Sequence, residues 1–182
     1  MHKHTNTHVL DRIKKTHQRN TKDIWDAANK GCLPAVQHYV GQDSKFVNMK
    51  DSDHLTPMYY AAQKGHARVV KYLIQNHVKI DAVDDLGFTA LQTASFHGHS
   101  LVVTFLLING ADVNHQNLWN LTALHYAVFM KHLEIVELLM KCNANKMLKD
   151  CENYSPLDLA RELNSREIIH YMETFQHTWY IQ

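Results

Sequence analysis

Cysteine is scarce in this chain, and its few cysteines follow no recognisable pattern. The 182 residues contain three, Cys32, Cys142 and Cys151. An odd number of cysteines without metal-ligand spacing excludes a disulfide framework and a cysteine-based metal site, and it favours reduced thiols. We therefore expect a protein of the cytoplasm or the nucleus.

Long apolar runs are absent as well. No stretch approaches the roughly 20 apolar residues that cross a bilayer, and Met1 to His4 do not begin the apolar segment of a signal peptide. The formal net charge is only +1, so the overall charge identifies no partner. The sequence predicts neither a membrane span nor export.

The motifs of common enzymes and metal sites are missing too. There is no glycine-rich phosphate loop, no G-x-S-x-G and no H-E-x-x-H. Of the 15 histidines, His97 and His99 form an H-x-H pair, but a zinc site needs three or four ligands. His2, His4 and His8 could bind a metal weakly, as any histidine-rich segment does. We expect no enzyme activity, no cofactor and no specific metal site.

What the chain does contain is a repeat. Four short segments recur at intervals of 33 residues, and they are Thr56-Pro57-Met58, Thr89-Ala90-Leu91, Thr122-Ala123-Leu124 and Ser155-Pro156-Leu157. A fixed period of this length is typical of a solenoid, in which each small unit packs on its neighbours. Function is therefore expected on surfaces and not in a catalytic pocket.

Each unit is predicted to hold two short helices and a projecting turn. A threonine hydroxyl followed by proline favours a helix start, which predicts a helix from Pro57 to Gln63. Gly65, Gly98 and Asn164 are expected to end such helices, and the runs that follow carry apolar residues at helical spacing. Turn-forming residues such as Asp84 to Gly87 then lead into the next unit.

These residues resemble the ankyrin repeat. The family's T-P-L-H-x-A signature stands here as Thr122-Ala123-Leu124-His125-Tyr126-Ala127, and its G-A-D-V-N loop is intact from Gly110 to Asn114. The resemblance implies an all-α solenoid of helix-turn-helix units with projecting β-hairpin loops. We expect a repeat domain over 23–182, with units at about 23–50, 51–83, 84–116, 117–149 and 150–182. Residues 1–22 form either a capping helix or a basic, histidine-rich arm.

The resemblance also assigns structural roles to the repeated histidines. His66, His99 and His132 share one position at the turn between the two helices, where the family's histidine bonds neighbouring loop backbone. His125 holds the signature position, with a packing and hydrogen-bonding role. Buried polar groups need such partners.

The positions that the repeat does not need carry the functional prediction. In ankyrin arrays, the hairpin tips and the exposed face of the first helix form a concave groove that binds protein partners. Here these positions carry apolar and aromatic side chains, namely Leu86, Phe88, Phe96, Leu118, Trp119, Leu121, Phe129, Met130 and Tyr154. Exposed aromatic residues and methionine are typical of interfaces. The chain is predicted to be a monomeric adaptor, scaffold or inhibitor that binds a partner protein.

Some of these side chains have a purely structural alternative. Phe88 and Leu121 could pack against adjacent hairpins, and Phe96 or Phe129 could turn inward between helices. Trp119 is the strongest single candidate for a partner contact, because a large aromatic residue at a hairpin tip is expected to have little to pack on.

Two other functions stay open at this point. Residues 1–22 hold six Lys or Arg against Asp11, which permits binding of nucleic acid or another acidic surface. Alternatively, the chain is a structural subunit of a larger or homo-oligomeric assembly, or an effector of an intracellular bacterium. The apolar Trp179 to Ile181 either folds back on the last unit, joins the interface or marks a cut through a longer protein.

One modification is implied by the family alone. Leu106, Asp112, Val113 and Asn114 resemble the pattern whose final asparagine is hydroxylated in animal cells. Asn114 is therefore a candidate hydroxylation site.

Overall fold

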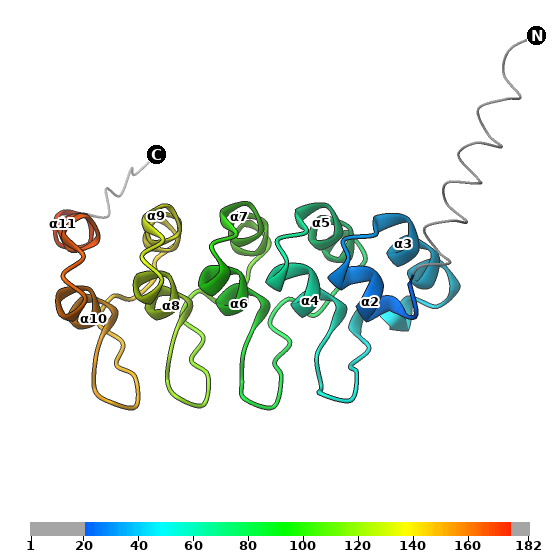
Figure 1. Cartoon of the computed structure of the whole chain (residues 1–182), viewed down its shortest axis with the longest axis horizontal. Coiled ribbons are helices and arrows are strands. Elements are labelled where there is room, and N and C mark those ends of the chain that lie inside the picture. The colour runs from blue at the N-terminus through cyan, green and yellow to red at the C-terminus, as the bar shows by residue number, and fades with distance from the viewer. Residues whose placement is uncertain (1–20, 176–182) are drawn as a thin grey trace, which may run out of the picture.

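Two parallel rows of short helices form the body of the protein in the computed structural model, which describes residues 21–175 (Figure 1). The inner row contains α2 (Ile24–Asn29), α4 (Pro57–Gln63), α6 (Ala90–His97), α8 (Ala123–Phe129) and α10 (Pro156–Glu162). The outer row contains α3 (Leu33–Gln42), α5 (Ala67–Gln75), α7 (Ser100–Ile108), α9 (Leu133–Lys141) and α11 (Arg166–Thr174). A 3-10 helix, η1 (Ser44–Asn48), follows α3. The predicted all-α solenoid of paired helices is confirmed.

The inner helices begin where the recurring segments predicted. Thr56, Thr89, Thr122 and Ser155 are the N-caps, and each side chain accepts a hydrogen bond from the backbone amide three residues later. This bond satisfies one of the amides that a helix start leaves without a partner. The helix predicted over Pro57–Gln63 is α4, with the same bounds.

A glycine follows the first helix of several pairs. A side chain of the next unit lies against it and leaves no room for a Cβ atom. Gly65 and Gly98 have φ angles of +72° and +79°. A Cβ on Gly65 would lie 2.6 Å from Nδ1 of His99, and one on Gly98 would lie 2.8 Å from Cε1 of His132. The histidine ring therefore occupies the space above the glycine of the preceding unit.

At the first three junctions these rings tie a unit to the one before it, as the resemblance implied. Nε2 of His66, His99 and His132 bonds the carbonyl of Asn29, Gln63 and Phe96, at 2.9, 3.0 and 3.2 Å. Each carbonyl lies at the end of an inner helix, where no intrahelical donor remains. The core between the rows is a continuous stack of small and branched apolar residues. Each helix pair packs on its neighbours along the stack.

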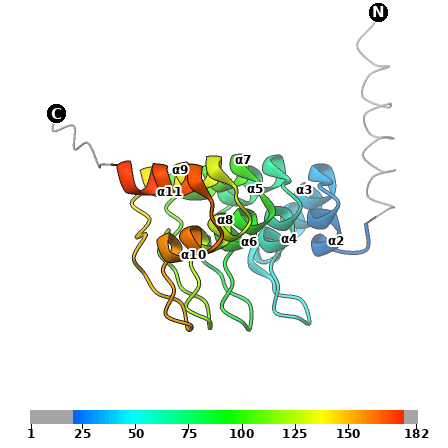
Figure 2. The ribbon, with the colours of Figure 1, turned by 60° about the vertical axis from the view of Figure 1, so that its left-hand side comes forward.

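Loops project from the inner row on the side away from the outer helices (Figures 1 and 2). The first residue of each loop, Asp51, Asp84, Asn117 or Asp150, accepts two backbone amides of its own loop through one side-chain oxygen. Within residues 21–175 these loops contain no β-strand, because side chains take amides that a hairpin ladder would pair. The predicted loops are present, but as tight turns.

Several predictions concern residues outside the described range. The basic segment at 1–22, the histidines near its start and the apolar Trp179 to Ile181 lie wholly or almost wholly there. They remain predictions.

Candidate functional site

The nine predicted contact residues lie on the inner helices and loop tips, which together we call the groove face. Six of them are exposed: Leu86, Leu118, Trp119, Phe129, Met130 and Tyr154. Leu118 and Phe129 expose 69% and 55% of their surface, which is far more than packing residues leave to solvent. Phe88, Phe96 and Leu121 are half-buried, so for them the structural alternative is partly realised.

Four aromatic rings of the groove face form one connected cluster. The ring of Phe88 lies 5.8 Å from that of Trp119 and 5.6 Å from that of Tyr126, centroid to centroid. The ring of Phe96 lies 5.9 Å from Tyr126 in an edge-to-face arrangement. Such geometry is favourable for aromatic pairs. The expectation that Trp119 has little to pack on was therefore wrong, because Phe88 of the neighbouring loop packs against it edge to face.

Backbone bonds between neighbouring loops hold the cluster in register. The amide of Leu118 bonds the carbonyl of Leu86 at 3.1 Å, and the amide of Cys151 bonds that of Trp119 at 3.0 Å. The loops are thus joined tip to tip. Trp119 sits on a fixed backbone and still leaves 41% of its surface exposed.

Tyr126 is, with Phe88, one of the two inner rings of the cluster, and the sequence prediction missed it. It lies in the first helix of its unit, at the position that Tyr60 holds in the unit at 51. Its hydroxyl accepts a hydrogen bond from Nδ2 of Asn117 at 2.8 Å. Burial raises the pKa of the Tyr126 hydroxyl above its usual value, so the ring stays neutral. The recurrence of tyrosine at one repeat position was the signal that could have identified it.

A hollow of about 330 Å³ opens beside the cluster, between the units at 117 and 150. Phe96, Trp119, Tyr126 and Phe129 contribute rings to its lining, and Asp150 and Glu152 contribute carboxylates. No lysine or arginine from the part of the chain that the structure describes lines it. The groove face therefore holds an open aromatic depression with acidic groups beside it.

His125 lies against this hollow as a neutral ring. Its Nδ1 accepts the backbone amide of Thr122 at 3.0 Å, so the proton is on Nε2, which lies 3.2 Å from the carbonyl of Tyr154. Burial lowers the pKa of the His125 imidazole below its ordinary value. The ring fastens the last loop to the inner helix, which is the structural role that the resemblance implied.

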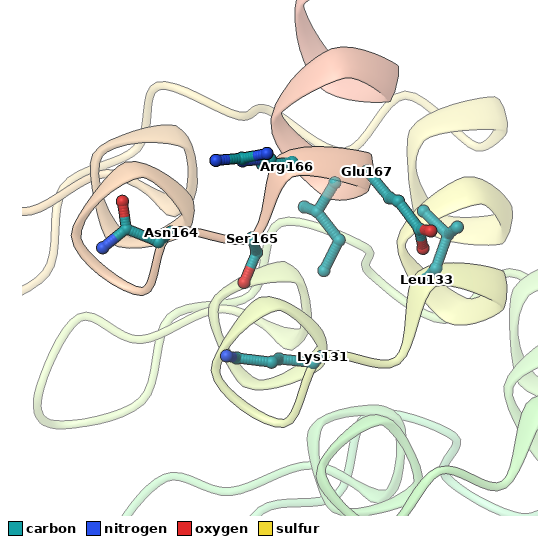
Figure 3. A pocket seen from close by; sticks show the side chains of 7 residues that line it. Lys131, Leu133, Asn164, Ser165, Arg166 and Glu167 are labelled. Atoms are coloured by element: carbon teal, nitrogen blue, oxygen red, sulfur yellow. The ribbon is translucent and has the colours of Figure 1, made fainter.

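A second hollow, of about 280 Å³, lies at the junction of the last two units (Figure 3). Lys131 and Ser165 stand there at the positions that hold glycine and histidine at the preceding junctions. Ser165 points toward the segment carrying Lys131, with Leu133 and Glu167 to one side. The buried Ser165 hydroxyl has no hydrogen-bond partner among the described residues. The hollow marks the missing histidine ring and is structural.

Asn114 is half-buried in its loop, with its amide engaged. Its Oδ1 accepts the backbone amide of Asn145 at 2.8 Å, and its Nδ2 donates to the carbonyl of Asn143 at 3.3 Å. The side chain thus joins the loop of its own unit to the loop of the next one.

Other exposed apolar side chains lie off the groove face. Leu101 and Ile108, near the two ends of the outer helix α7, are 58% and 70% exposed. The prediction did not name them. Within residues 21–175 no group of three or more His, Cys, Asp or Glu is placed to hold a metal ion. None of the helices described is both long and apolar enough to cross a bilayer.

Comparison with known proteins agrees with this architecture. A family model described as ankyrin repeats (3 copies) matches residues 24–117 and 102–174. The chain is 32% identical over 80 residues to mouse ankyrin repeat and SAM domain-containing protein 6, which is 43% of this chain and 9% of that protein. It is 36% identical over 70 residues to bovine ankyrin repeat domain-containing protein 49, covering 38% of this chain and 29% of the relative. Human ankyrin repeat domain-containing protein 39 is 34% identical over 61 residues, or 34% of this chain and 33% of that protein. The chain thus matches a third or less of each of these relatives.

Proposed function

Since this chain belongs to the ankyrin repeat family, we propose that it is a protein-interaction module whose groove face binds a segment of a partner protein. Ankyrin repeats are in general protein-protein interaction modules, and no catalytic domain is found in this chain. The observation that carries the proposal is the contiguous aromatic surface made by Phe88, Phe96, Trp119 and Tyr126, with Phe129 beside it.

The energetics support binding at this surface. Large aromatic anchors placed on rigid backbone lose little conformational entropy when a partner covers them. Burying about 400 Å² of apolar surface at about 25 cal/mol per Å² releases about 10 kcal/mol before the costs of association. Soluble monomers rarely expose a contiguous apolar surface of this kind unless it binds a partner.

Capture from cell lysate tests the proposal, with the full chain as bait. The test variant replaces Trp119, Phe129 and Met130 with alanine. A matched control replaces Leu101 and Ile108 of α7 with alanine, because these side chains are as exposed but lie in the outer row. Far-ultraviolet circular dichroism establishes that all three proteins remain helical.

We expect one or more proteins to be captured by the parent and the outer-row control and lost from the groove variant. Equal capture by all three baits would contradict the proposal. Capture that is equal for the parent and the groove variant but falls steeply as salt is added would instead favour the basic segment at 1–22. Contacts with phosphate and acidic groups depend strongly on salt.

Hydroxylation of Asn114 is proposed from the family resemblance. Because both polar atoms of the Asn114 amide are engaged by the next loop, a hydroxylase would act only on a locally opened chain. Mass spectrometry of the peptide containing Asn114, after incubation with an animal asparaginyl hydroxylase, should show one added oxygen. Its absence from the heat-unfolded chain as well as the folded one would contradict the proposal.

A further inference from the structure

We infer that the hollow between the units at 117 and 150 receives a lysine or arginine side chain of the partner segment, and this inference rests on the proposed function. One carboxylate, the aromatic rings around it and a lining without a described lysine or arginine favour such a side chain.

Among residues 21–175, one oxygen of the Asp150 carboxylate has no hydrogen-bond partner. In the unit at 51, one oxygen of Asp51 accepts the loop amides and Oδ2 accepts the hydroxyl of Tyr60 at 2.7 Å. In the unit at 150, Oδ1 of Asp150 accepts its two loop amides, each at 2.9 Å. The residue that matches Tyr60 is Leu159, which has no donor and itself lines the hollow. Oδ2 of Asp150 therefore has no hydrogen-bond partner among the described residues.

The charges around the hollow are unbalanced. Glu152 adds a second, exposed carboxylate to the lining. His125 is the basic residue of the lining, and burial holds its pKa low enough to keep it neutral. Lys149 precedes Asp150 in the chain, but its Nζ is engaged by Oδ1 of Asn153 at 3.0 Å. A cationic side chain entering the hollow would meet negative charge without a resident competitor.

The rings favour the same occupant. A cation over the face of tryptophan, tyrosine or phenylalanine is attracted by the ring's electrons, and tryptophan is the best of the three. Trp119, Tyr126 and Phe129 all line the hollow. A purely apolar occupant would gain contact with the rings, but it would strip water from Asp150 without offering a donor in return, which is unfavourable. A lysine or arginine stem covers the rings while its charged end reaches the carboxylate.

The test uses four capped pentapeptides, glycine-leucine-X-leucine-glycine, in which X is arginine, lysine, citrulline or norleucine. Citrulline and norleucine keep the shape of the cationic residues and remove their charge. Binding to the full chain is followed by nuclear magnetic resonance through the indole N–H signal of Trp119, which a Trp119→Phe variant identifies. Asp150→Asn is the test variant, since Asn117 shows that an asparagine amide holds the same loop. Asp84→Asn is its control, because Asp84 has the same loop position but does not line the hollow.

We expect the arginine and lysine peptides to shift the Trp119 signal in a saturable way, and to bind about 3- to 10-fold more tightly than their neutral counterparts. Asp150→Asn should abolish that preference, and Asp84→Asn should keep it. Equal binding of charged and neutral peptides, an unchanged preference in Asp150→Asn or no response to any peptide would each overturn the inference.

The two failures can be told apart. If the groove variant loses lysate capture but charged and neutral peptides bind equally well, the proposed function stands. Only the inference of a cationic side chain in the hollow is then overturned. Tighter peptide binding by a Lys14→Gln, Lys15→Gln variant would mean that the chain's own basic segment occupies the hollow. That result would overturn the inference that a partner's side chain occupies it.

Discussion

Gly65→Ala should destabilise the protein by more than the backbone conformation alone accounts for. The left-handed φ of +72° costs an alanine about 1–2 kcal/mol. In addition, the new Cβ would lie 2.6 Å from Nδ1 of His99. The ring must move, and its bond to the carbonyl of Gln63, 3.0 Å long, is worth about 0.5–1.5 kcal/mol. We expect a total loss of about 2–3 kcal/mol in the free energy of unfolding.

Two other glycines provide controls for that number. Gly110 also has a positive φ, +88°, but an added Cβ would meet nothing within 4 Å, so Gly110→Ala should show only the backbone cost of about 1–2 kcal/mol. Gly41 lies inside α3 with open space around it, so Gly41→Ala should stabilise the chain by about 0.5–1 kcal/mol.

Urea unfolding followed by circular dichroism measures all three variants. With a slope of about 2 kcal/mol per molar urea, a loss of 2–3 kcal/mol lowers the midpoint by about 1–1.5 M. A Gly65→Ala, His99→Ala double variant completes a mutant cycle, in which removal of the ring should recover part of the loss. Equal losses for Gly65→Ala and Gly110→Ala, or strictly additive losses in the cycle, would refute the contact argument.

Three further predictions concern the loops and the last junction. Asn114→Ala should lower the free energy of unfolding by about 1–3 kcal/mol, because the amide of Asn145 loses its acceptor; urea unfolding measures it, and Asn114→Asp, which keeps an acceptor oxygen, should cost less. His125 has a lowered pKa in the folded state, so the unfolded chain binds more protons as the pH falls below about 6.5; stability should decline there, and His125→Gln should flatten this part of the pH profile of the unfolding midpoint. Lys131→Gly combined with Ser165→His should raise stability by about 1–2 kcal/mol, since it removes a side chain at a φ of +58° and restores the missing ring; an unchanged or lower midpoint would contradict this.

The sequence was sufficient to predict the architecture because the residues that begin and end each helix recur in several units. A hydroxyl before Pro57 and again before Pro156 marks the same helix start. Because equivalent helices of the stack have similar surroundings, tertiary packing does not override this local preference in a single unit. The loops were harder to predict. Their composition indicated turns, but whether a side chain or a strand partner takes the loop amides depends on atomic distances that composition does not contain.

The groove residues were predictable by position but not by environment. Repeat position correctly placed Leu118 and Phe129 on an exposed face. It did not show that Phe88 from the preceding loop would pack against Trp119, because that contact joins two units whose separation is set by the stack. The contacts of Tyr126 with Phe88 and Phe96 likewise join neighbouring units, so its repeat position alone did not identify it.

The Asp150 carboxylate and the last junction each involve a residue that differs from its counterpart in another unit. Where Leu159 stands at the position of Tyr60, Asp150 keeps its place in the loop but lacks the hydroxyl donor that Asp51 has. Where Ser165 stands at the position of the repeated histidine, the helices remain paired and an open hollow lies at the junction in place of a bonded ring. A regular solenoid holds backbone positions constant, so a single substitution leaves an unfilled site instead of a repacked one. Asp150 is the departure that leaves charge beside exposed aromatic rings, and for that reason it is the one from which we expect partner selectivity.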